Sequence, residues 1–117
     1  IRIDKVTCVV DCGVVVNPDT VIGQTEGNVI FALTAALKKP ITFEKGAAVQ
    51  GNFDQYPLLG IHETPPIEVV IMDSQEAPGG VGETALPAIA PALTNAIFQA
   101  TGKRIRTLPF DIAQVSK

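Results

Sequence analysis

Hydrophobic and polar residues alternate along the first part of the chain, residues 1–16, which predicts a long β-strand. Apolar residues then recur at helical spacing over residues 21–37. Asn17 can cap the start of a helix, Pro18 suits its first turn, and Pro40 cannot continue it. The pattern therefore predicts a strand followed directly by a long helix.

Short hydrophobic runs fill the middle of the chain. Residues 41–53 read as two short strands joined by a turn at Lys45 and Gly46, and residues 67–73 read as a further strand. Between them, residues 54–66 are irregular and rich in proline. These signals predict a β-hairpin, a loop and one more strand.

A second helix is predicted for residues 85–102, where apolar residues share one face and Gly102 suits the C-terminal cap. Pro87 and Pro91 are compatible with this helix only if it starts late, because only the first turn of a helix needs no amide donors. Together, the predicted elements form an α+β fold with a mixed β-sheet and two main helices.

Composition and charge narrow the possible functions. The chain has 117 residues, enough for one compact unit, and its alternation is already present at Ile1, so we expect it to be part of a longer protein. A net charge of −3 with scattered basic residues argues against nucleic-acid binding. No apolar run approaches the ~20 residues of a membrane span.

Two cysteines and one histidine could suggest disulfide or metal chemistry. Cys8 and Cys12 lie four positions apart, which is ~13 Å along an extended strand and too far for a disulfide. Together with one distant histidine, His62, they do not make a zinc site. We therefore interpret the cysteines as small buried residues and His62 as a surface or loop-packing residue.

The sequence PGGVGET, residues 78–84, delivers one carboxylate, Glu83, after three glycines. Glycines let the backbone approach a ligand closely, and the helix predicted next points its N-terminus toward Glu83. The loop lacks the Gly-Lys-Ser/Thr ending of a P-loop and the third glycine of a dinucleotide fingerprint. Two interpretations of Glu83 remain, a carboxylate that stabilises the helix dipole and a positioned general base.

A similar question arises in the first predicted helix, where Gly23 and Gly27 flank Gln24. Each glycine in a helix interior costs up to ~1 kcal/mol relative to alanine. Two glycines one turn apart leave a groove for another backbone or a ligand, with Gln24 beside it as a hydrogen-bonding group. Plain helix packing is the alternative interpretation.

Four stretches of the chain, in this order, resemble one protein family: VVDCGVVVNPDTVIGQTEGNVIFALTAAL, NFDQYPLL, PPIEVVIM and PGGVGETALPAIAPALTNAIFQATGKRIRTLPF. The chain resembles the large, or beta, molybdenum-cofactor-binding subunit of the xanthine dehydrogenase/aldehyde oxidase family, and within it the isoquinoline 1-oxidoreductase beta-subunit type. The family's large subunit is several times longer. The resemblance thus implies that residues 1–117 are a C-terminal segment of a larger molybdopterin-binding domain.

The resemblance implies a molybdenum hydroxylase that oxidises aldehydes or N-heterocycles with oxygen taken from water. The implied cofactor is molybdenum on molybdopterin cytosine dinucleotide, and the implied path for electrons is through iron–sulfur clusters on a partner subunit. The protein is expected to give the metal no side-chain ligand. Members of this branch occur in the bacterial cytoplasm and in the periplasm, so no single compartment is implied.

The resemblance also implies roles for particular residues. Glu83 matches the family's glutamate, the general base that deprotonates the hydroxyl on the metal. Gln24 matches a glutamine that hydrogen-bonds the pterin dinucleotide, and the backbone amides of Gly80, Val81 and Gly82 are expected to line the metal pocket. A carboxylate base of this kind is expected in a buried site next to an anionic cofactor, where its proton affinity rises toward the working pH.

The other cofactor loops of the family lie outside these residues. We therefore expect the isolated chain to be inactive and to need the remainder of the large subunit and the iron–sulfur small subunit. Apolar interfaces left open in the isolated chain predict self-association into a homo-oligomer. The alternative hypothesis is a free-standing, non-catalytic α+β module that binds a ligand or a partner subunit.

Overall fold

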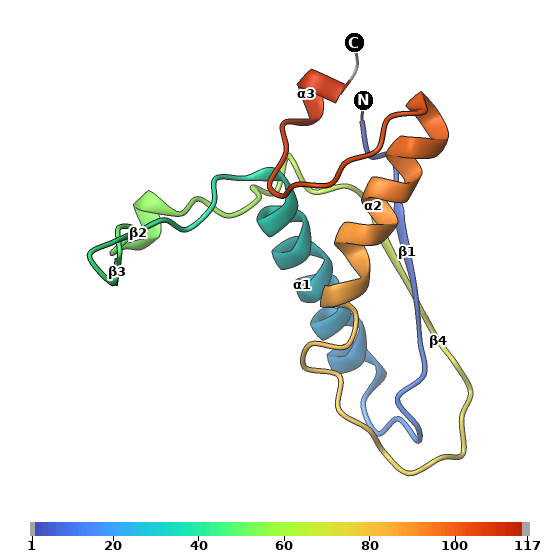
Figure 1. Cartoon of the computed structure of the whole chain (residues 1–117). Coiled ribbons are helices and arrows are strands. Elements are labelled where there is room, and N and C mark those ends of the chain that lie inside the picture. Colours follow the sequence, from blue (N-terminus) through green and yellow to red (C-terminus); the bar gives the residue numbers. More distant parts are fainter. Residues whose placement is uncertain (1, 116–117) are drawn as a thin grey trace.

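The computed structural model describes residues 2–115 (Figure 1). Two long helices and a pair of parallel strands form its body, and a small hairpin extends to one side. In chain order the elements are β1 Val6–Val10, α1 Pro18–Leu37, β2 Phe43–Glu44, β3 Ala47–Ala48, the 3₁₀ turn η1 Phe53–Gln55, β4 Ile67–Ile71, α2 Leu86–Thr101 and α3 Ile112–Val115. The predicted α+β class with two main helices is confirmed.

Helix α1 begins and ends where the sequence predicts. The Asn17 side chain accepts a hydrogen bond from the Thr20 amide at 3.2 Å, and Pro18 occupies the first turn. Such a cap stabilises a helix by about 1 kcal/mol. At the other end, the Lys38 amide donates to the Thr34 carbonyl at 2.9 Å, and the chain then leaves the helix in an extended conformation.

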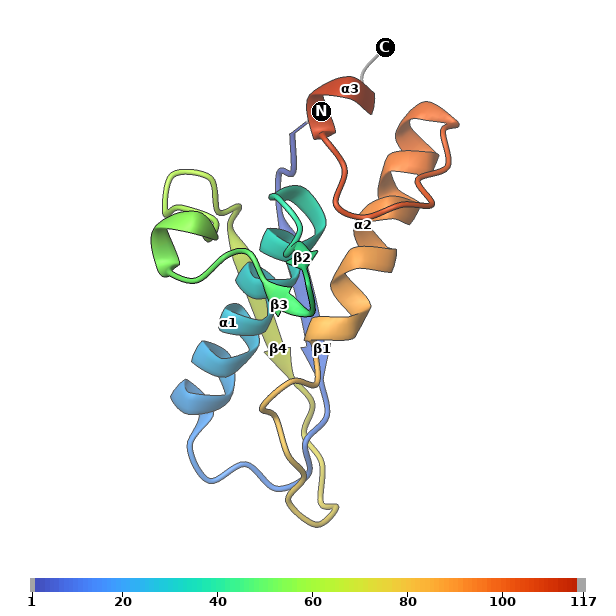
Figure 2. The ribbon, with the colours of Figure 1, turned by 60° about the vertical axis from the view of Figure 1, so that its left-hand side comes forward.

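Strands β1 and β4 run parallel, from Val6 opposite Ile67 to Val10 opposite Ile71. Since α1 connects them, the chain crosses over from one strand to the other through a helix, as parallel pairing requires. In Figures 1 and 2 both strands run in one direction, while α1 and α2 run the opposite way. The carboxyl ends of the strands and the N-termini of the helices therefore lie at the same end of the molecule.

The strand predicted for residues 1–16 is too long, because only Val6–Val10 pairs with another strand. Beyond it, the Gly13 amide donates to the Asp11 carboxylate at 3.1 Å, and the φ angle of Gly13 is 72°. This left-handed conformation turns the chain out of the sheet. A glycine turn therefore ends the strand pattern that side-chain alternation alone would continue.

The hairpin of β2 and β3 pairs antiparallel around a turn at Lys45 and Gly46, whose φ angles are 50° and 83°. The predicted turn is confirmed. The paired residues of both strands are exposed, and the hairpin projects away from α1 and α2 (Figure 1). In place of the predicted mixed sheet there are two separate two-stranded sheets, β1 with β4 parallel and β2 with β3 antiparallel.

Helix α2 ends as predicted, with Gly102 at a φ of 73°. Its start corrects the prediction, because the helix begins at Leu86 and contains Pro91. An interior proline costs about 3 kcal/mol. The side chains of Ile89 and Ile97 are 6% and 2% exposed, and burial of two isoleucines stabilises by about 3–6 kcal/mol, which offsets the proline.

The core is aliphatic, as composition indicates. Helix α1 packs against α2 and against strand β4. In Figure 2, α1 lies in front of the two strands and α2 stands beside it. The main buried cluster consists of Val29, Ala32, Leu33 and Ile89, with Val6, Cys8 and Ile67 from the strands packed against it. The opposite face of the pair is open, and Val9 and Val70 are 63% and 43% exposed there.

The chain is less compact than its length predicts. Its radius of gyration is 16.2 Å, whereas about 13 Å is typical of a compact domain of this length. Its accessible surface is 8031 Å², roughly a third more than a folded monomer of 12.3 kDa exposes. Across residues 2–115, no helix combines the length and hydrophobicity that a membrane crossing needs.

Candidate functional site

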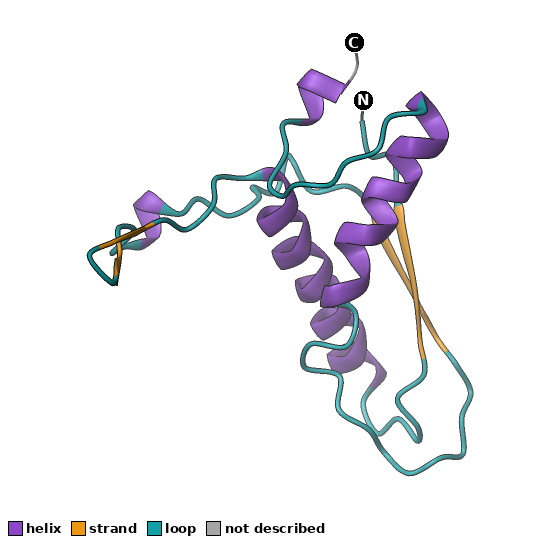
Figure 3. Cartoon of the chain, in the orientation of Figure 1, coloured by secondary structure: helices purple, strands orange, loops and turns teal. Residues whose placement is uncertain are grey.

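The loop between β4 and α2, residues 72–85, carries the carboxylate that the sequence singles out. It appears in Figure 3 as a long connection beyond the ends of the two strands. The Val14 amide donates to the Glu76 carbonyl at 3.0 Å, and the Gly79 amide donates to the Cys12 carbonyl at 2.8 Å. The first half of the loop is therefore held by backbone hydrogen bonds to the segment that follows β1.

Gly13 makes this contact between two loops possible. A Cβ atom on Gly13 would lie 2.2 Å from the Ala77 carbonyl oxygen and 2.7 Å from the Glu76 carbonyl oxygen. The φ angle of 72° is also unfavourable for any other residue. Space and backbone conformation both require glycine at this position.

The second half of the loop is held by helix α1. The Gln24 side-chain nitrogen donates to the Gly82 carbonyl at 2.9 Å, and the Asn28 side-chain nitrogen donates to the Val81 carbonyl at 3.4 Å. Gln24 and Asn28 lie one helical turn apart and so share one side of α1. The structure thus brings together three residues that the sequence singled out, Gln24, Val81 and Gly82, through contacts within the chain.

Asn28 is only 4% exposed and is not among the residues predicted from the sequence. It stands next to Val29 in an apolar stretch of α1, and its partner lies 53 residues away along the chain. One signal was available, since Asn28 follows Gln24 by four residues and therefore faces the same way. A second polar side chain at that spacing indicates a contact on that side of the helix.

Glu83 is exposed and lies two residues before Ala85, the N-cap of α2. No side chain caps this helix and no acidic residue lies in its first turn. The Glu83 carboxylate makes no hydrogen bond or ion pair with residues 2–115. The buried setting expected for it is not formed by this chain, because the loop faces open space.

The glycines around Glu83 are not required by packing within the chain. A Cβ atom added to Gly80 or Gly82 would meet no atom within 4 Å, and the same is true of Gly23 and Gly27 on α1. The close helix packing considered for Gly23 and Gly27 is therefore not formed by the described residues. In this part of the chain the amides of residues 80–83 donate no hydrogen bond either. The backbone of residues 80–83 is therefore open to close approach by a ligand or by another protein segment.

Val81 differs from the glycines on either side of it. Its side chain is half-buried and packs against the smaller core cluster of Val10, Cys12 and Val21. The side chain thus anchors the loop to the body of the fold. Only the backbone of Val81 is therefore placed to contact a ligand.

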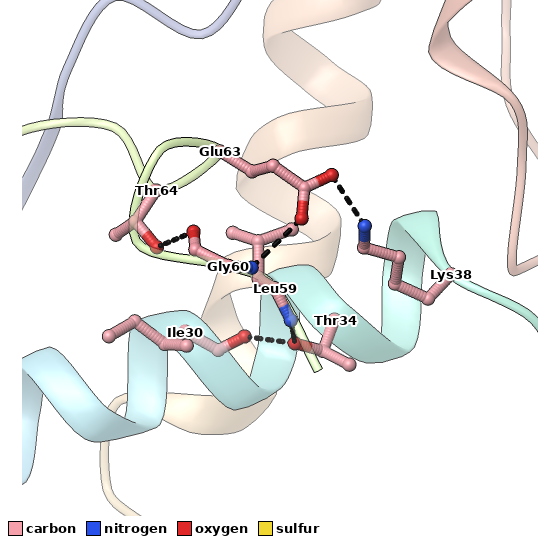
Figure 4. A network of polar contacts seen from close by, with 7 residues as sticks. All are labelled: Ile30, Thr34, Lys38, Leu59, Gly60, Glu63 and Thr64. Carbon is pink, nitrogen blue, oxygen red and sulfur yellow. Dashed lines mark hydrogen bonds and ion pairs between the residues drawn. The ribbon is translucent and has the colours of Figure 1, made fainter. Parts of the chain in front are cut away.

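A separate polar network joins the turn after Leu59 to the C-terminal half of α1 (Figure 4). The Leu59 amide donates to the Thr34 hydroxyl at 3.0 Å, and the Lys38 ammonium donates to Glu63 at 2.6 Å. The hydrogen bond from Lys38 holds the pKa of Glu63 below its usual range. Thr34 lies about 15 Å along the helix from Gln24, so this network braces the fold away from the glycine loop.

Within residues 2–115, no three His, Cys, Asp or Glu side chains gather in a way that could hold a metal ion. Cys8 and Cys12 are free thiols, partly and fully buried respectively, and burial raises the pKa of Cys8. His62 is exposed in a turn. The interpretation of these residues as structural agrees with their positions.

Bare glycine backbone beyond the carboxyl ends of parallel strands, next to helix N-termini, is typical of a ligand-binding end in an α/β unit. The family model described as "Molybdopterin cofactor-binding domain" matches residues 1–65, just over half of the chain. The chain therefore belongs to the family of molybdopterin cofactor-binding domains. The family resemblance noted in the sequence is confirmed.

Two relatives in sequence illustrate the family. The chain is 38% identical over 109 residues to the isoquinoline 1-oxidoreductase subunit beta of Brevundimonas diminuta. It is 38% identical over 111 residues to a Gluconacetobacter polyoxogenes protein named membrane-bound aldehyde dehydrogenase (pyrroloquinoline-quinone). The alignments include 93% and 95% of this chain but only 14% of either relative. The chain thus spans about one seventh of the length of these relatives.

The fold is also shared with a solved structure. Quinoline 2-oxidoreductase from Pseudomonas putida 86 superposes with a TM-score of 0.77 at 22% sequence identity. The match covers 94% of this chain and 15% of that chain. The two helices and the strands described above therefore occur together within a much longer protein.

Proposed function

We propose that residues 1–117 form part of the cofactor site of a molybdenum hydroxylase that oxidises aldehydes or N-heterocycles, with Glu83 as general base. The observation that carries this proposal is the Glu83 carboxylate, which stands without a partner among the described residues on a loop anchored by α1 and by the segment after β1. The names of the relatives, an isoquinoline oxidoreductase and an aldehyde dehydrogenase, support the two substrate classes.

The residues of the loop fit an anionic cofactor such as molybdenum on molybdopterin cytosine dinucleotide. Gly80 and Gly82 leave open space where a side chain would stand, and the amides of residues 80–83 are free within residues 2–115 to donate to a ligand. One N–H of the Gln24 amide donates to the Gly82 carbonyl, which leaves its second N–H and its amide oxygen for the pterin dinucleotide. When bound, the cofactor supplies two-electron oxidation and oxygen derived from water.

In this proposal Glu83 accepts the proton of the oxygen nucleophile that attacks the substrate carbon. A carboxylate acts as a base when it lies within hydrogen-bond reach of that proton, and removing such a base lowers the rate by about 10²–10⁴-fold. This role is supported by the position of Glu83 near the end of the loop, where its carboxylate has no partner among the described residues. The remainder of the large subunit provides the burial that this chain lacks. An iron–sulfur small subunit removes the electrons.

The test uses the holoenzyme whose large subunit carries this segment, isolated with its partner subunit. We expect Glu83→Gln to keep its molybdenum and to lose kcat by about 10²–10⁴-fold. Glu76→Gln is the matched control, since Glu76 is an exposed carboxylate of the same loop that contacts Val14 only through its backbone. Near-normal kcat in a molybdenum-loaded Glu83→Gln enzyme would refute the role of Glu83.

The alternative function is a non-catalytic module that binds a ligand or a partner subunit. The large accessible surface, 8031 Å², favours it, because a chain with this much open surface is suited to binding another protein. Metal analysis of the native protein separates the two functions. About one molybdenum per large subunit supports the hydroxylase, and its absence, or a quinone in its place, supports another function.

A further inference from the structure

We propose that Asn28 is a positioning residue for Glu83, an inference that rests on the proposed function of Glu83 as the base. Asn28 lies on α1 and is 4% exposed, and its side-chain nitrogen is 3.4 Å from the Val81 carbonyl oxygen. One turn earlier, Gln24 donates to the Gly82 carbonyl at 2.9 Å. The two carbonyls that directly precede Glu83 are therefore both bound by α1.

Helix packing alone does not explain an asparagine at this position. The buried side of α1 is mainly aliphatic and includes Val21, Val29 and Leu33. Thr25 is also buried, but its hydroxyl donates to the Val21 carbonyl of its own helix at 2.8 Å. Asn28 instead directs its amide to a loop 53 residues away. A buried amide needs a hydrogen-bond partner, and the loop supplies it.

The two hydrogen bonds act on either side of Gly82. The Val81 carbonyl and the Gly82 amide share one peptide plane, and the Gly82 carbonyl and the Glu83 amide share the next. The only rotations between these planes are φ and ψ of Gly82, the residue type with the least steric restriction. Binding both carbonyls restrains both planes and so limits the directions in which the backbone presents the Glu83 side chain.

Loss of the Asn28 bond frees the first plane while Gln24 still holds the second. The loop then rotates about Gly82, and the Glu83 carboxylate spends less time in its working position. A misplacement of about 1 Å can lower a rate by about 10²-fold. We therefore expect Asn28→Leu, which has the same branched shape without the donor, to lower kcat by about 10–100-fold and to change KM by less than about twofold.

The experiment is done in the holoenzyme with three readouts: molybdenum content, kcat and KM per molybdenum, and hydrogen–deuterium exchange of the peptide covering residues 78–85. Asn28→Asp is a second variant, because it keeps the size of the side chain and replaces the donor with an acceptor. Thr34→Val is the matched control. It also removes a buried polar group from α1, but one that bonds Ile30 and Leu59 and not the glycine loop.

Faster exchange in residues 78–85 with a selective loss of kcat in Asn28→Leu or Asn28→Asp supports the proposal. Unchanged exchange, unchanged kcat, or an equal loss of kcat in Thr34→Val overturns it. For a variant that loses molybdenum, only the hydrogen–deuterium exchange of residues 78–85 is used. Faster exchange there supports the role of Asn28 in holding the loop, and unchanged exchange overturns it. If Glu83→Gln retains normal kcat, the proposed function fails, while the exchange result still decides whether Asn28 holds the loop.

Discussion

Replacement of Gly13 by alanine tests how the base of the glycine loop is held. The new methyl group would lie 2.2 Å from the Ala77 carbonyl oxygen and 2.7 Å from the Glu76 carbonyl oxygen. Both neighbours are backbone atoms, so they cannot move as a flexible side chain does. The two segments must separate, which breaks the hydrogen bonds from Val14 to Glu76 and from Gly79 to Cys12.

The size of the effect follows from two contributions. Alanine in the left-handed region costs about 1–2 kcal/mol. Loss of two backbone hydrogen bonds adds about 1–3 kcal/mol. We therefore expect Gly13→Ala to lower the free energy of unfolding by about 2–5 kcal/mol. Gly102 provides the matched control, because its φ is 73° but an added Cβ meets nothing within 4 Å, so Gly102→Ala loses only the first contribution.

Urea unfolding of the 117-residue chain, followed by circular dichroism at low protein concentration, measures both variants under the same conditions. We expect the loss in Gly13→Ala to exceed that in Gly102→Ala by about 1–3 kcal/mol. Equal losses in the two variants would show that backbone strain alone is involved and would refute the close contact between the loops.

Two further predictions concern stability and assembly. The hydrogen bond from Lys38 lowers the pKa of Glu63 in the folded state. The resulting stabilisation is fully present above the pKa that Glu63 has in the unfolded chain, and it is lost as the pH falls through the lower pKa of the folded state. The Tm of wild type should therefore exceed that of Glu63→Gln at pH 7, and the difference in Tm should disappear as the pH falls below about 4. A difference in Tm that does not depend on pH would contradict a contribution from the ionised Glu63 carboxylate. Because Phe43 and Phe53 are 72% and 92% exposed, we expect the isolated chain to self-associate as its concentration rises in sedimentation velocity, and a strictly monomeric chain at high concentration would argue against this.

The features that the sequence predicted well depend on local chemistry. Asn17 caps α1, Lys45 and Gly46 form the hairpin turn, and Gly102 ends α2, each through contacts within a few residues. The family was also predicted from the sequence, because the resemblance depends on the order of several motifs along the chain. The order of motifs does not show contacts, so it could not reveal which residues of α1 touch the loop.

The predictions that failed depend on contacts between distant parts of the chain. The strand over residues 1–16 ends early because Gly13 turns against a loop some sixty residues later. Pro91 stays inside α2 because Ile89 and Ile97 are buried. The role of Asn28 was not predicted because its partner, Val81, lies in a loop 53 residues away. Alternation and propensity describe neighbours along the chain and contain no information on these pairs.

The shared direction of the two helices has an electrostatic consequence. Each helix N-terminus carries about half a positive charge, and α1 and α2 both begin at the end of the molecule where residues 78–84 lie (Figure 1). A chain of net charge −3 thus has one end at which the backbone field favours anions. This attraction comes from peptide dipoles and not from Lys or Arg side chains. It therefore persists when lysines are acetylated or the pH is raised, and it weakens with added salt.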